Sequence, residues 1–136
     1  MKDQLTIDHI NLTAKNLKES VKWYQNVFGF EPVESGKYFG KDWTILKNNQ
    51  VMICITEYAN RKPVDEDPTA EDYHRINHYG LKIQDKEAWE RLLRTNKLPT
   101  YHDSPVRYPH STSWYVKDPA GHTIEVAHWN NNRITF

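Results

Sequence analysis

Two short segments of the chain alternate apolar and polar residues, and each carries a histidine among the polar ones. The first is TIDHINL, with His9, and the second is NHYGLKI, with His78. Alternation with a period of two is typical of a β-strand that is buried on one face. We therefore expect both histidines on the open face of a sheet. The apolar positions are Ile10, Leu12, Tyr79, Leu81 and Ile83.

An amphipathic helix is predicted after each of these strands. The segment NLKESVKWYQNVFGF has apolar residues at a helical spacing, with Asn16 and Glu19 placed as a capping box and Gly29 as the C-terminal stop. The segment DKEAWERLLRTN has Asp85 as its N-cap. The residues expected to face the core are Leu17, Val21, Tyr24 and Phe28 in the first helix and Trp89, Leu92 and Leu93 in the second.

Further strands are predicted after each helix. The segment WTILKNNQVMICITEY indicates two strands around its pair of asparagines, with Cys54 on the polar face of the second strand. The segment SWYVKDPAGHTIEVAHW indicates a hairpin around the turn DPAG. When one half of the chain is laid over the other, His9 aligns with His78, and the strand of Cys54 aligns with the strand of Glu125. Further open-face positions are Asn11, Gly80, Ser113, Tyr115 and Thr123.

This repeat predicts an α+β fold with one domain over residues 1–136. Unit one covers about residues 5–58 and unit two about 75–130, and a polar linker with two prolines joins them over about 59–74. A chain of 136 residues is long enough for one domain with a real core and short for two independent ones. Since each unit is small, we expect the units to share a core or to pair with those of a second copy. A homodimer is expected on this ground.

The composition excludes several classes of partner. Eighteen basic and eighteen acidic residues cancel and form no long block of one sign. We therefore expect no nucleic acid and no anionic membrane as partner, and a small-molecule substrate fits better. Cys54 is the single cysteine, which excludes an internal disulfide, and the N-terminal residues have no apolar run typical of a signal peptide or membrane span. A soluble, cytoplasmic protein is expected.

The open faces of the predicted strands carry two imidazoles and one carboxylate. If His9, His78 and Glu125 meet in space, they form the ligand set of a facial-triad metal site with open coordination positions. Such a site suits a divalent transition metal, namely Fe²⁺, Mn²⁺, Zn²⁺ or Ni²⁺. The three side chains could come from one chain or from the two chains of a dimer.

The same stretches carry a family resemblance. IDHINLTAKNLKESVKWYQNVFGFEPV resembles the opening of vicinal-oxygen-chelate proteins, and SWYVKDPAGHTIEV resembles their closing hairpin, Y-x-x-D-P-x-G-x-x-x-E. The resemblance implies two βαβββ units that form a curved mixed sheet around a metal cavity. It also implies that His9, His78 and Glu125 match the metal-ligand positions. The superfamily includes glyoxalase I, fosfomycin-resistance thiol transferases, extradiol dioxygenases and metal-free bleomycin-binding proteins.

The chain departs from glyoxalase I and from the fosfomycin group at particular positions. Glyoxalase I carries a fourth ligand, a glutamate, on the strand that resembles VMICITE, where Cys54 stands. Glyoxalase chemistry is therefore disfavoured, and Cys54 is either a metal ligand or a small buried residue. Ser113 and Tyr115 match substrate-contacting residues of the fosfomycin group. The stretch YHDSPVRYPHST lacks the lysine and cation loop of its thiol transferases, and Arg107 is the candidate replacement.

The extradiol enzymes offer a second comparison. They share the tyrosine that matches Tyr115 and keep a catalytic histidine about nine residues earlier, where this chain has Val106. His110 and His102 are the nearby substitutes. We expect Tyr115 to donate a hydrogen bond to a substrate oxyanion and His110 to act as general acid or base. The residues expected to contact substrate are Asn11, Trp43, Cys54, Arg107 and Ser113.

Three hypotheses for function follow from these patterns. The first is a metal-dependent enzyme, of dioxygenase or thiol transferase type, whose metal acts as a Lewis acid on a small substrate that chelates it through adjacent oxygens. The second is a metal-free protein that binds a drug or metabolite. The third is a scaffold module without pocket chemistry.

Overall fold

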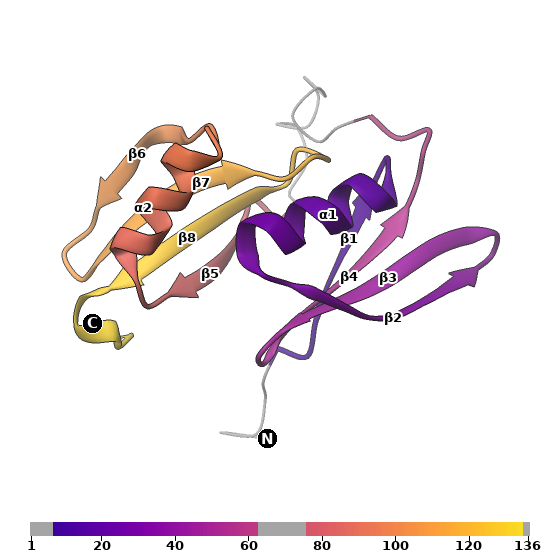
Figure 1. Ribbon diagram of the computed structural model, residues 1–136, viewed down its shortest axis with the longest axis horizontal. Coiled ribbons are helices and arrows are strands. Elements are labelled where there is room, and N and C mark those ends of the chain that lie inside the picture. Colours follow the sequence, from indigo (N-terminus) through magenta and orange to yellow (C-terminus); the bar gives the residue numbers. More distant parts are fainter. Residues whose placement is uncertain (1–6, 63–75, 135–136) are drawn as a thin grey trace. The chain divides into compact units, whose positions relative to one another are not determined.

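The computed structural model describes residues 7–62 and 76–134, which belong to two compact units, Met1–Glu66 and Asp67–Phe136 (Figure 1). The linker predicted over about residues 59–74 lies largely outside the described residues. Each unit contains one helix and one four-stranded mixed sheet. The predicted α+β fold with two βαβββ units is therefore confirmed.

Unit 1 has its strands in the spatial order β1-β4-β3-β2. Strand β1 is parallel to β4, and the other neighbouring pairs are antiparallel. Its elements are β1 (Ile10–Ala14), α1 (Leu17–Phe28), β2 (Glu31–Tyr38), β3 (Lys41–Asn48) and β4 (Val51–Glu57).

Unit 2 repeats this topology with the order β5-β8-β7-β6, and β5 is parallel to β8. A short 3-10 helix, η3, follows the last strand. The elements are β5 (Tyr79–Ile83), α2 (Lys86–Thr95), β6 (Tyr101–Arg107), β7 (Ser111–Lys117), β8 (Thr123–Trp129) and η3 (Asn130–Asn132).

Both helices begin at the predicted caps. The Asn16 side chain accepts a hydrogen bond from the Glu19 N–H at 3.0 Å, and Asp85 accepts one from the Ala88 N–H at 2.8 Å. Helix α1 ends at Gly29, whose φ of 64° lies in the left-handed region that glycine adopts without steric cost.

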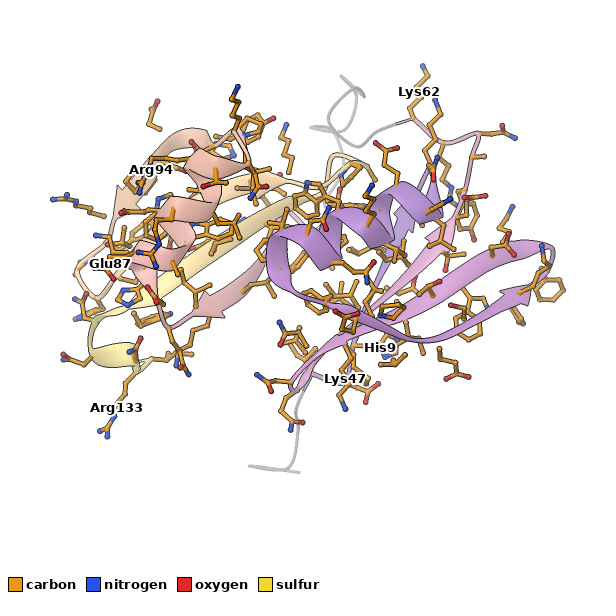
Figure 2. The ribbon with its side chains drawn as sticks, viewed as in Figure 1. His9, Lys47, Lys62, Glu87, Arg94 and Arg133 are labelled. Atoms are coloured by element: carbon orange, nitrogen blue, oxygen red, sulfur yellow. The ribbon has the colours of Figure 1, made fainter. Side chains whose placement is uncertain are left out.

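The charges of α2 complement its dipole. Glu87 lies in the first turn of this helix and Arg94 in the last (Figure 2). An acidic residue near the N-terminus and a basic one near the C-terminus stabilise the helix. This arrangement adds to the cap at Asp85 and supports a helix with few fully buried residues.

The face that α1 turns to the core differs from the predicted stripe. Its buried residues are Ser20, Tyr24 and Val27, at spacings of four and three, whereas Leu17, Val21 and Phe28 are half-buried. A small side chain such as Ser20 lets the helix approach its sheet closely, and the larger apolar residues pack at the edges of that contact. In α2, Trp89 is buried as predicted, and Leu92 and Leu93 are half-buried.

Each sheet buries one face and leaves the other more open. In unit 1, Leu12 and Ala14 are buried on β1, while Thr13 between them is half-buried and Asn11 before them is exposed. The predicted alternation of β1 is therefore confirmed, whereas on β7 the predicted open-face residues Ser113 and Tyr115 are also buried. The buried apolar residues of the strands are Leu12, Ala14, Leu46, Ile53 and Ile55 in unit 1 and Leu81, Trp114, Tyr115, Val116, Ile124 and Val126 in unit 2.

Neither helix meets the length and hydropathy that a membrane span requires, and no other helix of residues 7–62 and 76–134 does.

Candidate functional site

Strand pairing in unit 2 positions the carboxylate of Glu125. On β8 this residue pairs with Gly80 of β5 on one side and with Tyr115 of β7 on the other. The hairpin between β7 and β8 turns at DPAG, where Asp118 accepts hydrogen bonds from the Ala120 and His122 N–H groups. A tight turn of this kind fixes the register, and the register sets the Tyr115 and Glu125 side chains on one face.

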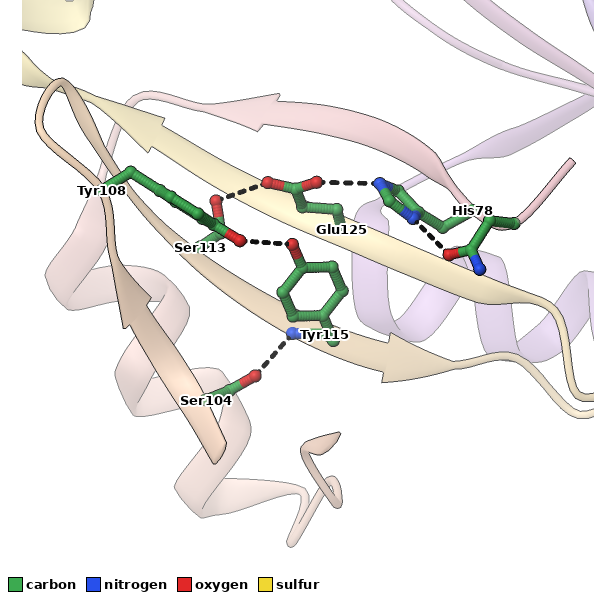
Figure 3. A network of polar contacts seen from close by, with 7 residues as sticks. His78, Ser104, Tyr108, Ser113, Tyr115 and Glu125 are labelled. Carbon is green, nitrogen blue, oxygen red and sulfur yellow. Dashed lines mark hydrogen bonds and ion pairs between the residues drawn. The ribbon is translucent and has the colours of Figure 1, made fainter. Parts of the chain in front are cut away.

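The Glu125 carboxylate has a partner at each oxygen (Figure 3). The Ser113 hydroxyl donates to Oε1 at 2.7 Å, and His78 Nε2 lies 3.0 Å from Oε2. The His78 side chain is 34% exposed and the Glu125 side chain 22% exposed. Unit 2 therefore brings together an imidazole and a carboxylate that a small solute can reach.

The second ring nitrogen of His78 is held by the residue before it. His78 Nδ1 lies 2.8 Å from Asn77 Oδ1. In unit 1, His9 Nδ1 lies 2.7 Å from Asp8 Oδ2 in the same way. Histidines that bind metals through one nitrogen usually donate the other N–H to an oxygen acceptor, which fixes the ring and its tautomer. Both predicted histidine ligands have this support.

Tyr115 lies beside the pair of His78 and Glu125. Its ring meets His78 edge to face at 5.6 Å between centroids, and its hydroxyl lies 3.0 Å from the Tyr108 hydroxyl. The backbone N–H of Tyr115 donates a hydrogen bond to Ser104 Oγ at 2.9 Å. The ring of His102 meets the Tyr115 ring edge to face, with 5.2 Å between the ring centroids. Contacts on several sides hold the Tyr115 ring in place.

The Tyr115 phenol remains protonated far above neutral pH. Burial raises its pKa most, and the Tyr108 hydroxyl and the Glu125 charge raise the pKa further. A protonated phenol can donate a hydrogen bond. Tyr115 is therefore suited to the predicted role of donor to an oxyanion.

Two predicted residues of unit 2 lie away from Glu125. Arg107 pairs with Thr112, and alternation along β7 turns Thr112 to the face opposite Ser113 and Tyr115. His110 is exposed and precedes Ser111, which pairs with Trp129, about 13 Å along β8 from Glu125. Their roles in substrate binding and proton transfer remain predictions, and the proposal below does not use them.

Sequence reasoning did not assign roles to Asn77, Ser104 or Tyr108. For Asn77 a signal was present, because Asp8-His9 and Asn77-His78 repeat an oxygen acceptor before each histidine. Ser104 and Tyr108 lie in or beside β6, whose sequence does not alternate. His102 was an alternative to His110 in the sequence, and it is His102 that contacts Tyr115.

Three predicted substrate contacts lie together in unit 1. Asn11, Trp43 and Cys54 line one pocket on the open face of its sheet, with a volume of about 520 Å³. The register pairs Asn11 with Cys54 as it pairs Gly80 with Glu125. Cys54 therefore occupies in unit 1 the position that Glu125 occupies in unit 2.

Two side chains of β4, Cys54 and Glu57, are the candidates for a fourth metal ligand. Burial raises the pKa of the Cys54 thiol, which disfavours the thiolate that binds metals. Glu57 Oε2 accepts a hydrogen bond from the Leu17 N–H at 2.8 Å, at the start of α1. Neither side chain is arranged as a charged ligand on the open face.

The residues of unit 2 fit part of a metal site. Within either unit, no group of three His, Cys, Asp or Glu side chains comes together among the described residues. Unit 2 supplies one imidazole and one carboxylate at 3.0 Å, and the second predicted imidazole, His9, belongs to unit 1. Nitrogen and oxygen donors of this kind suit a divalent transition metal with open positions.

The amino-acid sequence matches one known protein family over most of its length. A profile of the Glyoxalase/Bleomycin resistance protein/Dioxygenase superfamily matches residues 6–126. No curated protein sequence matches the chain.

Solved structures similar to the chain come from several bacteria. A glyoxylase/bleomycin resistance protein/dioxygenase domain from Frankia sp. EAN1pec has a TM-score of 0.77 at 13% identity and covers 96% of each chain. A glyoxalase family protein from Enterococcus faecalis has a TM-score of 0.76 at 17% identity, covering 93% of this chain and 99% of its own. At such identities the similarity shows a shared fold.

The fosfomycin resistance protein FosX from Listeria monocytogenes is also similar. One of its structures has a TM-score of 0.71 at 20% identity and covers 96% of this chain and 94% of its own. A mutant of FosX was crystallised with Mn(II) and 1S,2S-dihydroxypropylphosphonic acid, with a TM-score of 0.71 at 19% identity and 98% of each chain covered.

Proposed function

Since this chain belongs to the Glyoxalase/Bleomycin resistance protein/Dioxygenase superfamily, we propose that it is a metal-dependent enzyme acting on a small substrate with adjacent oxygens. His9, His78 and Glu125 would hold one divalent transition metal. When bound, the metal supplies Lewis-acid stabilisation of negative charge that develops on a substrate oxygen. The observation that carries the proposal is His78 Nε2 lying 3.0 Å from Glu125 Oε2, with the opposite ring nitrogen anchored on Asn77.

The other residues of unit 2 would position the substrate and its charge. Ser113 fixes one oxygen of Glu125 through its 2.7 Å hydrogen bond and leaves the other oxygen toward His78. The Tyr115 hydroxyl donates a hydrogen bond to the developing oxyanion, because its raised pKa keeps the proton on the phenol. Tyr108 orients that hydroxyl.

Asn77→Ala tests the support of His78. We expect the affinity for Zn²⁺ to fall about 10-fold to 100-fold, because the imidazole loses the acceptor that fixes its ring. Asn77→Asp keeps an oxygen at the same place and should retain the affinity. Competition with a chromogenic chelator measures both. Equal affinity of the folded Asn77→Ala protein and the wild type would show that Asn77 does not support a ligand.

Metal analysis and two activity assays test the function. The proposal expects about one transition metal per wild-type chain. Oxygen uptake with catechols and Fe²⁺ would identify a dioxygenase. Conversion of fosfomycin with Mn²⁺, measured with and without a thiol, would identify a thiol transferase or a hydrolytic relative, and the FosX complex with Mn(II) motivates that assay. Wild-type protein that binds no transition metal would end the proposal.

A metal-free binding protein is the second candidate. The aromatic pocket of about 520 Å³ in unit 1 favours it, because pockets of this size hold small organic ligands. A binding protein should gain thermal stability from a ligand in the presence of a chelator and should not require His78 or Glu125. The enzyme proposal requires both.

A further inference from the structure

The pocket in unit 1 has aromatic walls and lies on the same sheet face as His9. The wall residues include Trp43, Tyr38, Phe39 and Tyr58. Its volume of about 520 Å³ falls in the range of small-molecule sites, roughly 300–1,000 Å³. Aromatic rings give such a pocket a large apolar contact area with fixed geometry.

Strand register gives the direction in which the pocket runs. Strand β3 carries Lys47 and Lys41 on its open face, six residues apart, which is about 20 Å along a strand. Lys47 pairs with Met52, and the parallel pairing of β1 with β4 brings His9 to that end of the sheet. Figure 2 shows His9 and Lys47 at the same end of unit 1. Lys41 therefore lies at the end of the sheet far from His9.

The Trp43 ring of the pocket packs against Gly36, where no side chain stands in its way. Gly36 on β2 pairs with Trp43, and a Cβ added at Gly36 would lie 2.6 Å from Trp43 Cζ2. The indole therefore lies directly over the Gly36 backbone. At the turn between β2 and β3, Tyr38 and Phe39 are 69% and 85% exposed and contact each other edge to face at 4.5 Å. Large aromatic side chains this exposed at a pocket are typical of a binding surface.

The end of the pocket far from His9 is cationic. Lys41 Nζ lies 4.6 Å from the centre of the Tyr58 ring, and Arg61 Cζ lies 3.7 Å from it. Neither cation forms an ion pair with a carboxylate of the described residues, whereas the neighbouring Lys37 is paired with Asp42 at 2.8 Å. Of these two cations Lys41 lines the pocket, where its charge favours an anionic ligand.

We propose that this pocket binds the body of the substrate and that the substrate is an elongated organic acid. Its chelating oxygens lie at the His9 end, its aromatic body lies against Trp43, and its carboxylate or other anionic group lies beside Lys41. The chelating end rests on the function proposed above. Binding of the body and the anion needs no metal, which allows the two proposals to be tested separately.

The test uses metal-free wild-type protein and two matched probes. Biphenyl-4-carboxylate and biphenyl-4-methanol share the aromatic body and differ in charge. Calorimetric titration should show the carboxylate bound about five-fold more tightly, the amount typical of one partly exposed charge contact. Because Lys41 lines the pocket and Arg61 does not, Lys41→Met should remove most of this preference. Lys47→Met removes a charge from the same strand at the other end and should keep it.

Gly36→Ala tests the aromatic wall. Because the added Cβ displaces the Trp43 indole, both probes should bind at least about five-fold more weakly, while Lys41→Met affects only the carboxylate. Circular dichroism confirms that the variant is folded, and Trp43→Leu replaces it if it is not. Unchanged probe affinity in a folded variant would overturn the proposal, because the probes would then bind elsewhere.

Other outcomes also decide the question. Wild-type protein that binds neither probe at millimolar concentration, or binds both equally, overturns the proposal. If Phe39→Ser dissociates a dimer that binds no probe, the aromatic face is an interface between copies, and the proposal is again overturned. Zn²⁺ titration of the same samples separates the two proposals: metal binding without probe binding leaves the proposed function standing, and probe binding without metal binding leaves the pocket.

Discussion

Glu125→Ala is expected to weaken binding of a divalent transition metal by more than about 100-fold, since loss of an outer partner of a ligand alone costs about 10-fold to 100-fold. The variant removes the carboxylate and leaves one imidazole in unit 2. It also deprives Ser113 of its acceptor at 2.7 Å. Titration with Zn²⁺ in competition with a chelator measures the change.

Glu87→Ala is the matched control for this prediction. It removes the same charge from the same unit, at an exposed position in the first turn of α2 (Figure 2). Its metal affinity should equal that of the wild type. If Glu125→Ala binds metal as well as Glu87→Ala does, Glu125 is not a ligand and the proposed site is wrong.

Phe30→Ala is expected to lower the free energy of unfolding of unit 1 by about 3–5 kcal/mol. Phe30 is 2% exposed and packs edge to face on Tyr24 at 5.9 Å between ring centroids. Truncation removes this contact and leaves a cavity that the surrounding strands close only in part. Urea unfolding monitored by circular dichroism measures the loss.

Phe39→Ala provides the comparison, because it deletes the same side chain where it is 85% exposed. Its free energy of unfolding should stay within about 0.5 kcal/mol of the wild type. Similar losses for Phe30→Ala and Phe39→Ala would contradict the assignment of Phe30 to the core and of Phe39 to a solvent-exposed turn.

The inner strands and both helices could be predicted from the sequence because burial shapes their residue pattern. Strand β4 alternates Ile53 and Ile55 with Cys54, since one face meets the helix and the other is open. The caps at Asn16 and Asp85 could be predicted for a local reason, because each side chain bonds a backbone N–H three residues on.

The residue pattern alone did not predict two of the edge strands, β2 and β6. Strand β2 has no buried residue, and its sequence EPVESGKY shows no alternation. Strand β6 contains Pro105, which is tolerated at a sheet edge where its missing N–H is not needed. Only the family resemblance implied three strands after each helix. Strands β2 and β6 are defined by pairing with their partner strand more than by burial, and sequence periodicity cannot report that pairing.

One part of the candidate site could be predicted from the sequence, and another part could not. The turn DPAG fixes the β7–β8 register, which made the proximity of Tyr115 and Glu125 predictable. The contacts of Tyr108 and His102 with Tyr115 depend on how irregular β6 folds over β7, where the register shifts between Tyr101 and Val106. Such a shift has no signature in a single sequence.

The ligand set of the bound metal tests the central claim most directly. X-ray absorption spectroscopy of the Zn²⁺-loaded wild-type protein should show two imidazoles and oxygen ligands at about 2.0–2.2 Å, with no sulfur. His9→Ala should reduce the count to one imidazole. A Zn–S distance near 2.3 Å, which would indicate Cys54, or a single imidazole in the wild type, would contradict a site built from His9, His78 and Glu125.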